Sequence, residues 1–250
     1  MPSLGSHLSL ARLLAGRVAR AEIDADRGSF YLGATAPDIR VLTRGDREHT
    51  HFFTLDELAN QDSVARLFAT HPRLRDAAAL DTPTRAFMAG YLTHLLMDQI
   101  YIERIYREFF GSGSAFGDDP RGNVLDRVLQ YELDRRQREA ADAMAEIHEA
   151  LANCNSAADV RFIEQETLAR WREVATDIAA QPPDWERFKR LASRHLHAAG
   201  LDTDEAIEQF YRDLPAVLQE TLDHVTEARV EEFMAAAVDQ ATARLREYLA

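Results

Sequence analysis

The chain has 250 residues, of which 46% are hydrophobic, and this is enough to bury the core of one or two domains. Its 42 acidic and 29 basic side chains give a formal net charge of -13 at pH 7, whose field repels polynucleotides and anionic membrane surfaces. The only cysteine is Cys154, which excludes an intramolecular disulfide framework and a thiolate-rich zinc site. Metal ligands must therefore be nitrogen and oxygen atoms, and any phosphate-bearing ligand needs a local cation.

The N-terminal segment lacks the pattern of a secretion signal, because Arg12 and Arg17 interrupt what would be its hydrophobic run. No stretch of the sequence approaches the roughly 20 apolar residues that cross a bilayer. We therefore expect a soluble, cytoplasmic protein without a transmembrane segment.

Hydrophobic periodicity is helical along almost the whole chain, and runs of alternating β-branched residues are missing, so we predict an all-α fold. We interpret residues 1–250 as a single all-helical domain. It comprises a metal-site half (1–110), a loop rich in glycine, serine and proline (111–122) and a C-terminal helical half (123–250). The second half is mostly ordinary amphipathic helix, so the functional residues are expected in the first.

The expected helices follow in chain order. In the first half they cover residues 4–19, 27–35, 55–70 and 84–110, with a polar stretch over 43–50 and a start signal at Asp81-Thr82-Pro83. In the second half they cover residues 124–151 and 157–180, with a further helix opening at Pro182-Pro183-Asp184. A last pair spans residues 203–248, with a kink or break at Pro215.

The most informative segment is FMAGYLTHLLMD, which contains His94 and Asp98. At about 100° per residue, both lie on an apolar stripe of the predicted helix, opposite Glu103 and Arg107. A buried carboxylate needs a partner, which is commonly a metal ion, an arginine or a hydrogen-bond network. Gly90, one turn before His94, removes a side chain where another backbone or a ligand could come close. Taken alone, the pair is also explained by a His–Asp hydrogen bond in a helical core.

Three other segments carry similar residues. His7 lies on the apolar stripe of the first helix, where the alternative is a core or capping histidine. Asp38 follows Pro37 in a run of small residues, where the alternative is a helix N-cap or an Asx-turn. His49 and His51 stand at alternate positions beside phenylalanines, and on an extended segment they would point to opposite sides, so only one of them is expected as a ligand.

These residues form a mixed imidazole and carboxylate set. It suits zinc, or less selectively manganese or iron. One metal site accounts for five side chains that are costly to bury, whereas the alternatives need a separate structural role for each of them. The predicted ligands are His7, Asp38, His49 or His51, His94 and Asp98.

The same segments resemble a known family. The stretches PSLGSH, LGATAPDI, THFF and AFMAGYLTHLLMD are similar, in order and in spacing, to motifs of the zinc-dependent phospholipase C family. The resemblance covers residues 2–110, and the last motif is its most specific part. It implies a multi-helical bundle whose fold is shared with single-strand-specific zinc nucleases. The Thr-His-Phe context favours His51 over His49.

The resemblance implies a cluster of zinc ions that hydrolyses phosphate esters. In it, His7 and Asp98 would bind one ion, and Asp38, His51 and His94 would bind another that Asp98 shares. The resemblance also places Asp38 near the attacking water, which it would orient or deprotonate as the catalytic residue.

The chain departs from the family in two ways. Secreted members use their processed N-terminal residue as a ligand, whereas here a short leader precedes His7. Members also have a further site of later histidines and a glutamate, for which Asp126, Glu132 and His148 are the candidates here. One or two ions are therefore expected.

The expected function is hydrolysis of phosphate esters by metal-bound hydroxide. The acidic surface favours a small phosphoester or a phospholipid headgroup over a long nucleic acid. The alternatives are a helical His-Asp phosphohydrolase acting on small nucleotides, and a non-catalytic protein with a structural metal site. The oligomeric state is not determined by the sequence.

Overall fold

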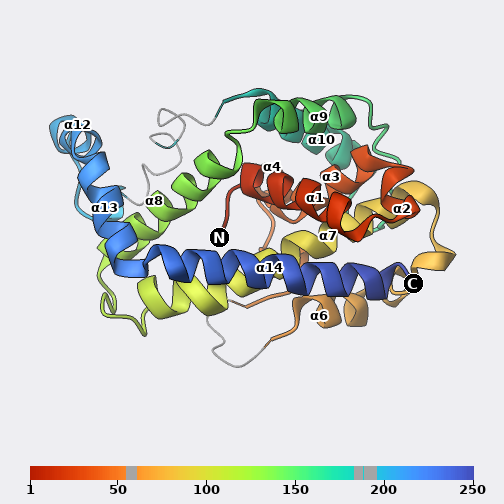
Figure 1. Ribbon diagram of the computed structural model, residues 1–250, viewed down its shortest axis with the longest axis horizontal. Coiled ribbons are helices and arrows are strands. Elements are labelled where there is room, and N and C mark those ends of the chain that lie inside the picture. Colours follow the sequence, from red (N-terminus) through yellow and green to blue (C-terminus); the bar gives the residue numbers. More distant parts are fainter. Residues whose placement is uncertain (55–60, 183–187, 189–195) are drawn as a thin grey trace. The chain divides into compact units, whose positions relative to one another are not determined.

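The computed structural model describes residues 1–54, 61–182, 188 and 196–250. Every regular element in these ranges is a helix and no strand occurs among them, which confirms the predicted all-α class (Figure 1). None of the helices in these ranges is long and apolar enough to cross a bilayer.

The first part of the chain forms the α-helices α1 (Leu4–Val18), α2 (Ala21–Asp24), α3 (Arg27–Thr35), α4 (Arg40–Thr43), α5 (Glu48–His51), α6 (Ser63–Thr70) and α7 (Thr82–Tyr101). Short 3-10 helices lie between them, namely η1 (Ala36–Ile39), η2 (Pro72–Leu74) and η3 (Ala77–Ala79). After a π-helical segment, η4 (Ile102–Phe110), come α8 (Pro120–Gln137), α9 (Ala141–Ala152), α10 (Gln165–Ala180), α12 (Asp204–Arg212), α13 (Leu214–Val225) and α14 (Glu227–Tyr248).

The chain divides into two compact units, each assembled from segments that are distant in the sequence. The larger unit comprises Leu4–Gln99, Gln137–Pro182 and Ala237–Ala250. The smaller unit comprises Met1–Ser3, Ile100–Arg136 and Pro183–Ala236. The first segment of the larger unit carries His7, Asp38, His49, His51, His94 and Asp98.

In the larger unit, α3 packs on α1, α9 and α10, and α9 and α10 run side by side (Figure 1). Residues 86–95 of α7 are buried on every side. A helix that is apolar all round belongs in the core of a unit rather than at its surface. The stripe that the sequence predicted on α7 is therefore part of a wholly buried stretch.

Two glycines let α3 and α7 touch through their backbones. A Cβ atom at Gly90 would lie 1.9 Å from the carbonyl oxygen of Phe30, and one at Gly33 would lie 1.9 Å from that of Phe87. No side chain can occupy such a distance, so only glycine permits this crossing. The close approach expected at Gly90 is confirmed, and the approaching group is the backbone of α3.

The single helix expected over residues 124–151 is wrong, because the chain breaks between α8 and α9. Arg138, at the break, is only 3% exposed, and its Nη2 atom donates to the carbonyl oxygen of Ile178 at 2.7 Å. The guanidinium thus satisfies one of the last carbonyls of α10, which have no partner within their own helix.

The segment expected as helix over residues 157–180 becomes helical only at Gln165, where α10 begins. Ser156 and Arg161 adopt φ values of 55° and 65°, which interrupt a helix. The residues before α10 instead carry Phe162 and Ile163 into the wall of a pocket.

Pro215 lies in the first turn of α13, which confirms the predicted break. The region over residues 203–248 was expected to form two helices but forms three, α12, α13 and α14. The additional break is at Thr226, where φ is 69°. α6 ends at Thr70, as the sequence predicts. Residues 55–60 of its expected helix, and most of the helix expected to open at Pro182-Pro183-Asp184, lie outside the described residues.

Candidate metal centre

Five of the predicted ligands meet at one place in the larger unit, which we call the metal centre. The Nε2 atom of His7 lies 3.3 Å from Oδ1 of Asp98. The Nε2 atom of His51 lies 3.3 Å from Oδ1 of Asp38 and 3.4 Å from Oδ2 of Asp98. The Nε2 atom of His94 lies 3.7 Å from the same Asp98 oxygen. Two groups of three have donor atoms close enough to share an ion, namely His7, His94 and Asp98, and Asp38, His51 and His94.

His49 does not join the metal centre. It is exposed on α5 and lines a neighbouring pocket, whereas His51 is 1% exposed. The two were expected on opposite sides of an extended segment. They are helical instead, and a spacing of two residues also separates side chains around a helix.

The helix crossing fixes how His94 presents its ring. Its Nδ1 atom lies 2.9 Å from the carbonyl oxygen of Ala34, at the end of α3. A carbonyl only accepts, so Nδ1 carries the proton and Nε2 keeps a lone pair. The ring of His7, from the first turn of α1, stacks on His94 with centroids 3.7 Å apart.

A hydroxyl orients His51 in the same way. The Oγ1 atom of Thr50 donates to the carbonyl oxygen of Arg47 and lies 3.1 Å from Nδ1 of His51. Because its only proton is used, Oγ1 accepts from Nδ1, and Nε2 of His51 again keeps its lone pair. Asp38, in η1, caps no helix and faces His51, so its N-cap and Asx-turn alternatives are not realised.

Several buried polar atoms of the centre have no hydrogen-bond partner. They are both ring nitrogens of His7, Nε2 of His51, Nε2 of His94 and Oδ1 of Asp98. Buried polar groups are almost always satisfied, and each unsatisfied one costs about 1–3 kcal/mol. Imidazole nitrogens and carboxylate oxygens left open toward each other are the donor set that zinc, manganese or iron takes. The residues therefore fit a divalent ion.

Both carboxylates of the centre are ionised at neutral pH. Burial acts to raise the pKa of Asp38, but the adjacent imidazole of His51 and the charge of His94 lower this pKa to about 2. The pKa of Asp98 is held well below its ordinary value, against burial, chiefly by the charge of His94 and the adjacent imidazole of His7. Ionised carboxylates are the form that binds a metal.

The histidines of the centre differ in their affinity for a proton. Burial and the charge of His94 lower the pKa of His7 to about 4. Burial also lowers the pKa of His51. The pKa of His94 is raised, because the charge of Asp98 and the hydrogen bond to it outweigh the burial that opposes charging. The metal-free centre therefore takes its first proton on His94.

Arg47 is the member of the centre that the sequence prediction missed. It is 9% exposed, its Nη2 atom donates to Oδ2 of Asp98 at 3.1 Å, and its Nη1 atom donates to the carbonyl oxygen of Phe53 at 3.0 Å. It lies four residues before His51, a spacing that places two side chains on one helical face. Treating residues 43–50 only as a polar stretch concealed that signal.

The donor atoms fit one complete site rather than two. Both three-residue groups use His94, whose only open nitrogen is Nε2 because Nδ1 is bonded to Ala34. An imidazole nitrogen donates its single lone pair to one ion. The Oδ2 atom of Asp98 already has the guanidinium of Arg47 as its cation. Only one group can therefore be complete at a time.

The candidates for a further site have other partners. Asp126 accepts from Tyr101 at 2.7 Å and from Gln130 at 2.6 Å, and Glu132 forms ion pairs with two arginines. In the part of the chain that the structure describes, neither they nor His148 belong to a group able to hold a metal ion. The structure assigns these carboxylates to hydrogen bonds and ion pairs.

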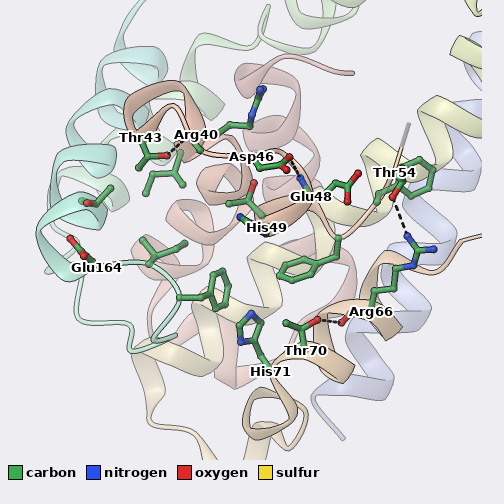
Figure 2. Close-up of a pocket in the computed structure, with 18 of the residues that line it drawn as sticks. Arg40, Thr43, Asp46, Glu48, His49, Thr54, Arg66, Thr70, His71 and Glu164 are labelled. Carbon is green, nitrogen blue, oxygen red and sulfur yellow. Dashed lines mark hydrogen bonds between the residues drawn. The ribbon is translucent and has the colours of Figure 1, made fainter. Parts of the chain in front are cut away.

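A pocket of about 830 Å³ adjoins the segments that carry the centre (Figure 2). The clustered ligands are absent from its wall, but Ile39, Thr50 and Phe52, their neighbours in the chain, belong to it. Figure 2 shows His49 and His71 approaching the pocket from opposite sides. The volume is in the usual range for small-molecule sites.

Comparison of the chain with protein-family models, with curated proteins and with solved structures finds no match. The chemistry of this protein must therefore be inferred from the metal centre and the pocket beside it.

Proposed function

We propose that the protein is a metal-dependent hydrolase of small phosphate esters, of the kind suggested by the resemblance of its first 110 residues to zinc-dependent phospholipases C. The observation that carries the proposal is the convergence of three buried histidines with open Nε2 atoms on two ionised carboxylates. We propose zinc as the metal, because nitrogen-rich donor sets favour it, and a single ion, because His94 can serve only one.

A divalent ion held there would supply Lewis acidity toward a phosphoryl oxygen and lower the pKa of a water molecule to roughly 7. Asp38 is the member of the centre best placed to take a proton from that water. Its side chain is 19% exposed, whereas that of Asp98 is 4% exposed. Its low pKa keeps it ionised, and its Oδ1 atom lies 3.3 Å from Nε2 of His51.

Two arginines supply the local cation that a phosphate needs in a protein of net charge -13. Arg47 is bonded within the centre, and Arg40 lines the pocket with a buried Nε atom that has no hydrogen-bond partner. The two are close enough for the charge of Arg40 to add to the effect of burial in lowering the pKa of Arg47. A guanidinium is suited to phosphate because its donors match the phosphoryl oxygens.

The depth of the centre favours a second candidate function, a metal site that only holds the helices together. His7, His51, His94 and Asp98 are each no more than 3% exposed, so only Asp38 offers a route to solvent. In that case removing the metal would unfold the protein, and no ester would be cleaved at any metal loading.

One experiment tests the proposal and separates the two functions. Protein that has never met a chelator is analysed for metal and assayed with bis(p-nitrophenyl) phosphate. We expect about one equivalent of metal and measurable turnover, both of which His94→Ala removes because it deletes a ligand. His49→Ala, which changes an exposed histidine outside the centre, should retain both.

Two results would count against the proposal. Metal well below one equivalent in the unchelated protein would contradict the metal centre itself. Stoichiometric metal without turnover, together with unfolding on chelation, would leave the structural function.

A further inference from the structure

Three aromatic side chains form one wall of the pocket. The rings of His71 and Phe162 stack with their centroids 4.4 Å apart, and Phe52 meets them edge-on at 5.7 Å and 6.0 Å. Figure 2 shows the imidazole of His71 directed from the end of α6 toward the pocket. Such a wall presents apolar, polarisable surface to whatever enters.

This wall is physically connected to the metal centre. Thr50 lines the pocket and also orients His51 through its hydroxyl. Tyr91 donates a hydrogen bond to the carbonyl oxygen of Thr50, and its ring lies 5.7 Å from that of Phe162. Burial and the negative charge of Asp38 raise the pKa of Tyr91, which places this phenol beside the centre as well.

A residue with a strained backbone lies at the point where the chain passes from the metal centre to the aromatic wall. Phe52 ends α5 in the left-handed region, with φ at 53°, which is unusual for a residue with a Cβ atom. The turn leaves His51 in the centre and Phe52 in the aromatic wall. Strain of this kind persists where the surrounding structure requires it, commonly at binding sites.

Many polar groups of the wall are already used within the protein. Thr43 accepts from the backbone nitrogen of Gly45, and Thr54 and Thr70 are bonded to Arg66 (Figure 2). The buried Nε atom of Arg40, by contrast, has no hydrogen-bond partner.

We infer that this pocket binds the organic part of the substrate, and that this part is an apolar, flat ring whose phosphate lies toward Arg40 and the metal centre. The inference rests on the proposed function and narrows it to phosphate esters of ring-bearing, hydrophobic alcohols. Stacking on Phe162 and His71 would supply the affinity for the ring. The phosphate would supply a negatively charged partner for the guanidinium of Arg40.

The test measures binding rather than turnover. Calorimetric titration of the metal-loaded protein with phenylphosphonate and with methylphosphonate compares two ligands that share a phosphonate and cannot be hydrolysed. We expect phenylphosphonate to bind roughly tenfold more tightly, the scale of one good ring contact. Equal affinities, or no binding of either ligand, would overturn the inference.

Variants assign the preference to the wall. Phe162→Ala removes the ring from the wall and should therefore reduce the preference several-fold. Phe162 lies outside any helix, so the substitution changes no helical residue. Phe162→Leu, which retains apolar bulk without a flat face, should restore only part of it. Phe109→Ala changes another half-buried phenylalanine, in the smaller unit, and should leave the preference intact. An unchanged preference in Phe162→Ala would also overturn the inference.

The outcomes separate this inference from the proposed function. A ring preference that depends on Phe162, in a protein that hydrolyses no ester, would support the pocket and refute the hydrolase. Hydrolysis that is equally efficient for aryl and methyl esters would support the hydrolase and refute the pocket.

Discussion

The two carboxylate oxygens of Asp98 have different surroundings. Oδ2 accepts from Arg47, whereas Oδ1 is buried with no hydrogen bond. One carboxylate thus combines two of the solutions available to a buried charge, an arginine and an open coordination position. The sequence analysis considered an arginine and a metal ion only as alternative partners of this carboxylate.

Arg47→Leu should destabilise the metal-free protein by about 3 kcal/mol, because it leaves the Asp98 charge buried without its guanidinium. Bound zinc should recover part of this loss by supplying a replacement cation. Urea unfolding with and without zinc measures both effects. The control is Arg17→Leu, which breaks an exposed pair with Asp239 and should cost about 1 kcal/mol or less. Equal losses in the two variants would contradict the role given to Arg47.

Zinc affinity should depend on pH through His94. A metal binds only the neutral imidazole, and the raised pKa of His94 means that its proton must be displaced at higher pH than usual. His7, with its pKa lowered to about 4, stays neutral over the same range, and the pKa of His51 is also lowered by burial. Apparent affinity should therefore fall by about tenfold per pH unit below the pKa of His94, the slope for one displaced proton. Chelator competition at several pH values measures this slope, and an affinity independent of pH would refute it.

At the scale of the elements, the α3–α7 crossing builds the centre. It brings the end of α3 against α7, and the Ala34 carbonyl then fixes the tautomer of His94. The contact depends on glycine in both helices. The backbone contact between α3 and α7 therefore determines both the packing of the two helices and the geometry of the site.

Gly90→Ala should damage stability and metal binding together. The new Cβ atom would lie 1.9 Å from the Phe30 carbonyl oxygen, so α3 must move and carry Ala34 away from His94. We expect a loss of about 1–3 kcal/mol in unfolding free energy and weaker zinc binding. Gly16→Ala, in α1, has nothing within 4 Å of the added atom and should instead stabilise by up to about 1 kcal/mol. Denaturant unfolding and zinc titration of both variants check this, and an undamaged Gly90→Ala would contradict the account.

At the scale of the whole molecule, net charge and local charge act in opposite directions. The formal net charge of -13 repels an anionic ester at long range, whereas Arg40 and Arg47 attract it near the centre. Which of the two dominates depends on distance and on salt.

Moderate salt should therefore raise kcat/KM for an anionic diester. Raising ionic strength from about 10 mM to about 150 mM shortens the screening length from roughly 30 Å to roughly 8 Å and removes most of the long-range repulsion. A neutral phosphotriester serves as the control, because its encounter rate should not change. A fall in kcat/KM for the diester would show that local arginines dominate even at long range.

The sequence alone determined the all-α class and the residue types of the centre, because helical periodicity and buried-type histidines are local patterns. It also predicted that another backbone or a ligand could come close at Gly90. It missed the break at Arg138, a residue whose side-chain partner is a distant helix terminus. The resemblance favoured His51 over His49, and the tertiary structure places only His51 in the centre. Only the tertiary structure paired Arg47 with Asp98 and left Nε2 of His94 open. Each of these depends on contacts between segments far apart in the chain, which no local pattern encodes.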